Sequence, residues 1–256
     1  MNFSEKVVIV TGAGSGMGKA MVKEFYEEGA KVVLVGRTKS KLDKVIETLG
    51  SSDKLFAIEL DVSNENAVQA AIQAVKDKWG TVDVLINNAG VLDSYASAHE
   101  VSLEEWNQTI AINLTGPFLM SKHVIPLMLT QKKGAILNIS SVSALSAAGG
   151  GSAYTASKHG LDGLTKQLCF EYGHQGIRVN SLLPGATATP MAMPESKTQF
   201  DPDVEAAITK VPARRWCQPE EIAKLASFMT SDKADYIHGS AFVIDGGWLT
   251  GARDAF

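Results

Sequence analysis

The chain has 256 residues, of which 45% are hydrophobic and 20% charged, and this length suits a single α/β domain. Its formal net charge of −4 argues against a nucleic-acid binder, because neutralising phosphates requires a basic face. Two cysteines, Cys169 and Cys217, are too few and too far apart for a disulfide framework or a thiolate metal site, so we expect two reduced thiols.

The amino-terminal stretch MNFSEKVVIVTG has an apolar run too short for the core of a signal peptide, and no long apolar run suited to crossing a bilayer follows. We therefore expect a soluble cytoplasmic protein that does not interact with a membrane. None of the five histidines has metal-ligand spacing to another, so no metal site is predicted.

Seven short apolar runs recur along the chain, with longer helical stretches between them. This alternation predicts a parallel sheet covered on both faces, that is, a doubly wound α/β fold with three layers (α/β/α) in one domain over 1–256. The runs are VVIV (7–10), VVLV (32–35), LFAIEL (55–60), VLI (84–86), AILNI (135–139), VNSLL (179–183) and AFVI (241–244). Two helix starts are also predicted, one capped by Ser102 and one at Gln218-Pro219, each followed by a pair of glutamates.

A glycine-rich turn follows the first predicted strand, where residues 11–19 read TGAGSGMGK. The common dinucleotide fingerprint would need glycine at position 17, which is Met17, so the literal motif fails and glycine at 12, 16 and 18 fits instead. A tight turn without side chains lets backbone N–H groups approach a pyrophosphate at the start of the next helix. We predict a nucleotide site here, formed by Gly12, Ser15, Gly16, Met17 and Gly18.

The end of the second predicted strand bears on the choice of cofactor. In a dinucleotide fold this position carries an acid when the ribose 2′-hydroxyl is free, whereas a nearby arginine accommodates a 2′-phosphate. Here Gly36 stands where the acid would be, and Arg37 follows it. The sequence therefore predicts that NADP(H) is preferred over NAD(H), while Lys39 and Lys41 are interpreted as the surface of the next helix.

Two further strand ends are expected beside the adenine half of such a cofactor. LDV at 60–62 contributes Asp61 and Val62, and NNAG at 87–90 contributes Asn88, Ala89 and Gly90. The Asp61 carboxylate could accept a hydrogen bond from an adenine amino group, and the small residues at 89–90 allow close approach.

One long irregular stretch, 184–212, carries five of the eight prolines. Ligands of open parallel sheets bind outside the carboxyl ends of the strands, and loops of this length are uncommon without a function. We predict a substrate lid around 186–212; the alternative is an ordinary surface loop with a short helix.

Taken together, these motifs resemble one family. TGAGSGMG (11–18), NNAG (87–90), Asn113, Ser141, Tyr154-x-x-x-Lys158, PGATAT (184–189) and DGG (245–247) occur in the order found in the short-chain dehydrogenase/reductase family. The resemblance covers essentially the whole chain. It implies a single Rossmann-type domain of seven parallel strands, nicotinamide-dependent oxidation and reduction, and usually a homotetramer.

Tyr154 and Lys158 form the centre of the predicted chemistry. Four residues apart on a helix, they share one face, so the ammonium can lie beside the phenol and favour its ionised form. By resemblance, Tyr154 donates a proton to the substrate carbonyl oxygen, and Lys158 binds the nicotinamide ribose and tunes Tyr154. Asn113 would support a water in the proton path.

Three more side chains are assigned by the resemblance. Ser141 would hold the carbonyl oxygen in line, with the neighbouring Ser140 and Ser143 as alternatives that fit the spacing less well. Thr187 and Thr189 would contact the carboxamide of the nicotinamide, although Thr187 departs from the aliphatic residue that is frequent there.

A largely apolar substrate pocket is expected over the nicotinamide. The segment VSALSAAGGGS between the predicted catalytic serine and tyrosine consists almost entirely of small residues, which leaves room for a substrate. The predicted pocket residues are Tyr95, Ser143, Leu145, Met191 and Met193.

The sequence thus predicts NADPH-linked reduction of a ketone, either a 3-oxoacyl thioester or a small carbonyl compound. Lys132 and Lys133 suit an acidic acyl carrier, but Gln175 stands where we would expect an arginine. Dehydrogenation of a sugar or another secondary alcohol is the alternative. A non-catalytic nicotinamide sensor should have lost the tyrosine or the lysine, and this chain retains both.

Overall fold

The seven predicted strands form one parallel sheet in the computed structural model, which describes residues 1–147, 149–193 and 202–251. The strand order is β3-β2-β1-β4-β5-β6-β7, with all neighbours parallel. The strands are β1 (Val7–Thr11), β2 (Lys31–Gly36), β3 (Leu55–Glu59), β4 (Val84–Asn87), β5 (Gly134–Ile139), β6 (Ile177–Pro184) and β7 (Ala241–Ile244). The order reverses between β1 and β4, so a crevice is expected at their carboxyl ends.

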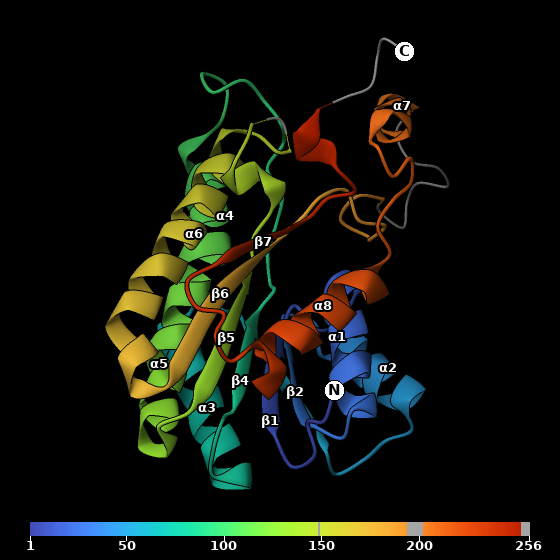
Figure 1. The fold of residues 1–256 in the computed structure, drawn as a ribbon. Coiled ribbons are helices and arrows are strands. Elements are labelled where there is room, and N and C mark those ends of the chain that lie inside the picture. The colour runs from blue at the N-terminus through green and yellow to red at the C-terminus, as the bar shows by residue number, and fades with distance from the viewer. Residues whose placement is uncertain (148, 194–201, 252–256) are drawn as a thin grey trace.

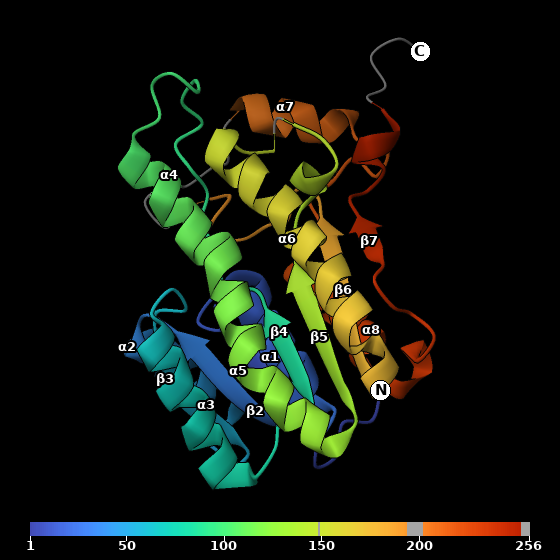
Figure 2. The same cartoon turned by 90° about the vertical axis from the view of Figure 1, so that its left-hand side faces the viewer.

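Helices cover both faces of this sheet, as Figures 1 and 2 show. One layer contains α1 (Gly16–Glu27), α2 (Lys39–Leu49) and α8 (Pro219–Thr230). The other contains α3 (Glu65–Trp79), α5 (Gly116–Gln131) and α6 (Ser152–Tyr172). The helix α4 (Leu103–Ile110) runs through a π-helical segment, Ala111–Thr115, into α5. The predicted doubly wound, three-layer fold is confirmed.

The core follows from the alternation of side chains along the strands. Val8 and Val10 of β1 pack against the layer of α1, α2 and α8, whereas Val7 and Ile9 pack against the opposite layer. All four are buried, which explains why the central strands read as continuous apolar runs. The edge strand β7 is less covered, and Val243 is exposed.

Both predicted helix starts are confirmed. Ser102 Oγ accepts from the backbone N–H of Glu105 (3.1 Å), while the Glu105 carboxylate accepts from the N–H of Ser94 instead of returning to the cap (2.5 Å). At α8, the Glu221 carboxylate accepts from the backbone N–H of Gln218 (2.9 Å), and a proline occupies the first helical position.

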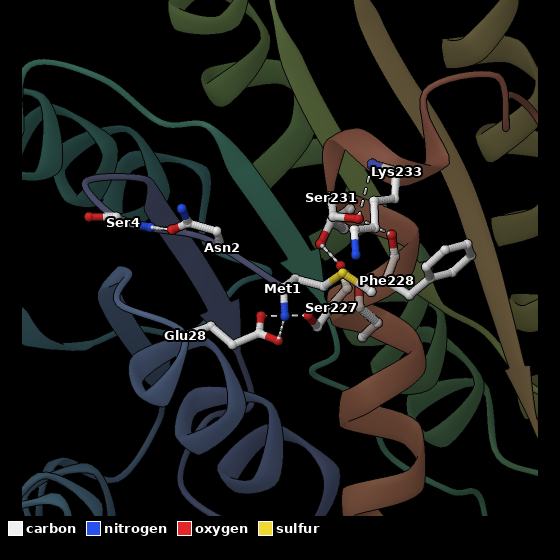
Figure 3. A network of polar contacts seen from close by, with 10 residues as sticks. Met1, Asn2, Ser4, Glu28, Ser227, Phe228, Ser231 and Lys233 are labelled. Carbon is white, nitrogen blue, oxygen red and sulfur yellow. Dashed lines mark hydrogen bonds and ion pairs between the residues drawn. The ribbon is translucent and has the colours of Figure 1, made fainter.

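The amino terminus closes the end of the sheet at which the strands begin. Figure 3 shows the Met1 amino group paired with Glu28, which follows α1. Ser227 Oγ of α8 donates to the same carboxylate (2.6 Å). Phe3 packs edge-on against Phe25 of α1, with ring centroids 5.0 Å apart. At the opposite end of the sheet, where the strands finish, the long loops after β4 and β6 begin.

Part of the predicted lid is helical. The helix α7 (Pro202–Lys210) lies at the end to which the strands point (Figure 2). Thr187 is anchored by an isolated parallel bridge to Cys217. Residues 194–201 of the predicted lid lie outside the described residues, and the lid itself stays a prediction. Within the described part of the chain, no helix is long and apolar enough to cross a membrane.

Candidate active site

The glycine turn between β1 and α1 is shaped by two close approaches. Gly12 has φ +66°, and a Cβ there would lie 2.9 Å from Asn88 Nδ2. A Cβ at Gly18 would lie only 2.1 Å from the carbonyl oxygen of Gly12. The first turn of α1 therefore sits directly on the loop, and any side chain at these positions would fill the space. Such a bare turn at a helix N-terminus suits a pyrophosphate.

The other residues predicted in this turn occupy distinct places. Ser15 caps α1 with its backbone and makes no side-chain cap bond. Gly16 has φ +50°, and a Cβ there would come within 3.2 Å of the Thr189 side chain, so the loop after β6 reaches the turn. The Met17 side chain packs against the core, and the contact of its backbone with a cofactor stays a prediction.

A hydroxyl that the sequence analysis missed joins the turn to β4. Thr11 Oγ1 accepts from the N–H groups of Asn88 (2.9 Å) and Ala89 (3.0 Å). The Asn88 amide in turn donates to the Thr11 carbonyl oxygen (2.9 Å). The side chain of Asn88, predicted to bind cofactor, thus holds β4 against β1.

A pocket brings together most of the residues predicted for the adenine half. It is lined by Gly12, Gly36, Arg37, Leu60, Asp61, Val62, Ala89, Gly90, Val91 and Ile112. Both Asp61 and Arg37 are exposed at its rim. Hydrogen bonds from Ser63 Oγ (2.7 Å) and Ser63 N–H (2.9 Å), together with the Arg37 charge, lower the pKa of Asp61.

The basic residues after Arg37 lie as predicted on a helix surface. Lys39 is the first residue of α2 and pairs with Asp43 one turn later. Its backbone N–H donates to Glu59 Oε1 (3.4 Å), a carboxylate that stands opposite Gly36 in the register of β2 and β3. An acidic side chain, Glu59 of β3, therefore lies beside the end of β2.

The four residues predicted for catalysis are buried and come from three places in the fold. Tyr154 and Lys158 lie on α6, Ser141 follows β5, and Asn113 sits in the π-helical segment. Lys158 Nζ is 5.5 Å from the Tyr154 ring centroid and donates to the carbonyl oxygen of Ile139 (2.9 Å). The structure thus brings the ammonium and the phenol together as the helical spacing predicted.

The Asn113 side chain is already occupied by protein. Its Oδ1 accepts from the N–H of Val91 (2.8 Å), and its Nδ2 donates to the Val91 carbonyl oxygen (2.9 Å) and to Ser157 Oγ (3.2 Å). Both amide hydrogens are therefore used. π-Helical turns often mark functional sites, and this one aims Asn113 at the loop after β4.

The hydroxyls of the three neighbouring serines differ in their surroundings. Ser140 Oγ donates to the Lys158 carbonyl oxygen (3.4 Å), and Ser143 is fully buried. Ser141 Oγ accepts from the N–H of Ser143 (3.1 Å) and donates to Ser143 Oγ (3.2 Å), and hydrogen bonding with Ser141 lowers the pKa of Tyr154. The geometry favours Ser141 among the three.

Burial dominates the electrostatics of the pair. It raises the pKa of Tyr154 to about 12, against the hydrogen bond from Ser141, while the Tyr95 phenol and the Asp93 charge raise it further. Burial also lowers the pKa of Lys158 to about 8, opposed by the charge of Asp162. The sequence predicted a phenol made more acidic by its lysine neighbour; in the structure the pKa of Tyr154 is instead raised, because burial removes the water that would stabilise a phenolate.

The side chains predicted to form the substrate pocket differ in their exposure. Tyr95, Leu145 and Met191 are 57%, 55% and 44% exposed, and their role as pocket residues stays a prediction. Tyr95 has φ +60° and its hydroxyl donates to the Gly149 carbonyl oxygen (3.3 Å). Met193 is half-buried.

The loop after β6 holds the two predicted threonines. Thr187 is buried, and its hydroxyl donates to the carbonyl oxygen of Gly185 (3.1 Å). Thr189 is half-buried beside Gly16. Among the described residues, no cluster of three His, Cys, Asp or Glu side chains suits a metal ion.

Comparison with known proteins identifies the chain. A family model described as enoyl-(acyl carrier protein) reductase matches residues 12–249. The chain belongs to the short-chain dehydrogenase/reductase family. It is an oxidoreductase that acts on carbonyl or alcohol groups and binds a nicotinamide cofactor.

Three relatives within the short-chain family show the range of substrates. Levodione reductase of Leifsonia aquatica is 36% identical over 254 residues, which cover 96% of this chain and 94% of that protein. D-threitol dehydrogenase of Mycolicibacterium smegmatis is 39% identical over 246 residues, covering 95% and 92%. The crystal structure of a 3-ketoacyl-(acyl-carrier-protein) reductase from Brucella melitensis with NADH matches with a TM-score of 0.87 at 34% identity, covering 95% and 98%.

Proposed function

We propose that the protein carries out NADPH-linked reduction of a ketone, a 3-oxoacyl thioester or a small carbonyl compound, to a secondary alcohol. The observation that carries this proposal is the buried group of Ser141, Tyr154 and Lys158 at the carboxyl ends of the strands, on the same edge as the glycine turn.

The bare turn at Gly12 and Gly18 fits a dinucleotide, because any side chain there would collide with backbone or with Asn88. Backbone N–H groups of the turn would hold the pyrophosphate, and Lys158 would bind the nicotinamide ribose. When bound, the reduced nicotinamide supplies the hydride that the carbonyl carbon receives. The remaining contacts are proposed for Ser15, Gly16, Met17, Asp61, Val62, Ala89, Gly90, Thr187 and Thr189.

The proton-transfer residues suit reduction. A phenol with a pKa of about 12 is protonated at neutral pH, so Tyr154 is ready to donate to the developing alkoxide. Ser141 would donate a hydrogen bond to the same oxygen. Lys158, with a pKa of about 8, is mainly charged at pH 7 and stabilises the phenolate left behind. Oxidation would need the phenolate first and therefore a higher pH.

The preference for NADPH rests on Arg37, which lines the pocket beside Gly36 and Asp61. We expect Arg37→Asp to weaken NADPH binding roughly 10- to 100-fold, because a charge-assisted bond is lost and a repulsive charge added. NADH affinity should stay level or improve, since Glu59 already supplies an acid nearby. Cofactor titration by fluorescence measures both, with Lys23→Asp, an equal charge change on α1, as the control. If the ratio of NADPH affinity to NADH affinity is the same in Arg37→Asp as in wild type, Arg37 does not bind the 2′-phosphate.

Dehydrogenation of a sugar or another secondary alcohol is the second candidate, favoured by the 39% identity to D-threitol dehydrogenase. A substrate panel distinguishes the two: NADPH and NADH consumption with acetoacetyl thioester, diketones, aldehydes and sugars, and the reverse reaction with the matching alcohols. We expect the highest kcat/KM with NADPH and a ketone. Turnover confined to polyols would favour the alternative, and no turnover at all would contradict the proposal.

We also propose a homotetramer. Phe118 on α5 and Phe170 on α6 are 44% and 83% exposed, so two long helices present aromatic rings to solvent. Sedimentation should give four times the chain mass, and Phe170→Glu should shift the distribution to smaller species. A wild-type monomer at micromolar concentration would contradict this assembly.

A further inference from the structure

A buried carboxylate, Asp93, lies in the loop after β4 and contacts the helix that carries Tyr154. Its Oδ1 accepts from the N–H of Gly151 (2.6 Å), and its Oδ2 accepts from the N–H of Tyr154 (2.9 Å). These are open donors of the first turn of α6, which begins at Ser152. The side chain thus caps a helix from 58 residues away in the sequence.

The fit between Asp93 and the helix start is close. Gly151, the N-cap position of α6, provides no side chain to cap its own helix. A Cβ at Gly151 would lie 2.7 Å from both carboxylate oxygens of Asp93. The glycine therefore leaves room for a carboxylate from another loop to take the capping position. An ionised group is also the one that the N-terminus of a helix dipole favours.

We infer that Asp93 is a positioning residue for the proposed proton donor: its two hydrogen bonds hold the backbone of Tyr154 at the start of α6 and so fix the place from which the phenol transfers its proton. This inference rests on the proposed function, in which Tyr154 is the donor. It assigns Asp93 no contact with substrate or cofactor.

The direction of the charge effect follows from the groups that face Tyr154. Lys158 approaches from α6 itself, Ser141 from the loop after β5, and Tyr95 and Asp93 from the loop after β4. Among these, Asp93 is the anion. A negative charge disfavours the phenolate, so Asp93 raises the pKa of Tyr154. Removing that charge should move the proton transfer to lower pH.

Two variants separate the charge from the hydrogen bonds. Asp93→Asn removes the charge and keeps one acceptor, so the midpoint of the pH–rate profile should shift to lower pH while kcat at the optimum stays within a few-fold. Asp93→Ala removes both bonds as well, and misplacement of the phenol should lower kcat roughly 10- to 100-fold. NADPH affinity, measured by fluorescence, should not change in either.

A third measurement needs no substrate. Hydrogen exchange of the backbone amides at 151–154, followed by mass spectrometry, should be faster in Asp93→Ala than in wild type. Asp83→Asn is the matched control. Asp83 also accepts from a distant backbone N–H, that of Val7 (2.9 Å), but at the opposite end of the sheet. The Asp83→Asn substitution should lower the melting temperature without changing the pH–rate profile or the hydrogen exchange of the amides at 151–154.

The profiles are recorded with NADPH and whichever carbonyl compound of the substrate panel has the highest turnover. If both Asp93 variants lose stability and exchange faster but keep the wild-type midpoint and kcat, Asp93 is a structural cap and the inference is overturned. If Tyr154→Phe keeps wild-type turnover, or no panel compound reacts, the proposed function fails first, and the inference with it.

Discussion

Tyr154→Phe should lower kcat for carbonyl reduction by about 10²–10⁴-fold, the usual contribution of a positioned general acid. The substitution removes only the hydroxyl and keeps the ring that lies 5.5 Å from Lys158 Nζ. KM for the carbonyl compound and affinity for NADPH should change little, because the proton is transferred only in the transition state.

Steady-state kinetics and a fluorescence titration measure these quantities. Tyr236→Phe is the matched control, since Tyr236 is fully exposed after α8 and outside the site. Undiminished turnover in Tyr154→Phe would contradict the proposed mechanism. A loss of NADPH binding equal to the loss of activity would instead show that the phenol acts mainly on the cofactor.

Gly18→Ala is expected to have the second large effect, on cofactor binding. Its Cβ would lie 2.1 Å from the Gly12 carbonyl oxygen and 2.7 Å from Asn88 Nδ2. The backbone oxygen cannot rotate away, so α1 and the turn must separate, and the N–H groups that would face the pyrophosphate move with them. A displacement of that order should weaken NADPH and NADH binding alike, by roughly 10²-fold.

Gly163→Ala on α6 is the control for this variant, because nothing lies within 4 Å of a Cβ there. Alanine in an exposed helix should stabilise the fold slightly, by up to about 1 kcal/mol, and leave cofactor affinity as in wild type. Wild-type affinity of Gly18→Ala for both cofactors would show that the pyrophosphate does not bind at this turn.

Local sequence patterns were sufficient for the fold. Each of the seven apolar runs is a strand, because a strand buried on both faces needs apolar residues at successive positions. The helix starts at Ser102 and Gln218 were predicted for a similar reason, since capping depends on residues within one turn. The Tyr154–Lys158 pair shares a face because the helix repeat places residues four apart together.

Contacts between residues far apart in the sequence could not be predicted from local patterns. Asp93 caps a helix 58 residues later, and no local pattern marks an aspartate in a loop as a cap for a distant element. Thr11 reads as the last residue of a strand, and only the structure shows its hydroxyl bonded to Asn88 and Ala89. Asp162 was within reach of the sequence, because it lies one helical turn after Lys158, whose pKa its charge raises.

The pKa of Tyr154 was missed for a different reason. Helical spacing places a cation beside the phenol, but it contains no measure of how completely the surrounding loops exclude water. Burial raises the pKa of Tyr154 to about 12, and the other contributions come from Ser141 after β5 and from Tyr95 and Asp93 in the loop after β4. Helical spacing is enough to predict that the lysine lies beside the phenol, whereas the exposure of the phenol to water depends on the whole fold.

The Thr11 hydroxyl lies at the carboxyl end of β1, between two groups of predicted site residues. Gly36, Arg37 and Asp61 lie on the β2–β3 side of β1, while Ser141 and Tyr154 lie on the far side of β4. The N–H groups of Asn88 and Ala89 both donate to this hydroxyl. The distance between the two groups of residues is therefore held by a contact in which neither group takes part. We therefore expect substitutions on one side to leave the residues on the other side in place, so that the proposed cofactor preference and the proposed carbonyl chemistry can be altered by mutation one at a time.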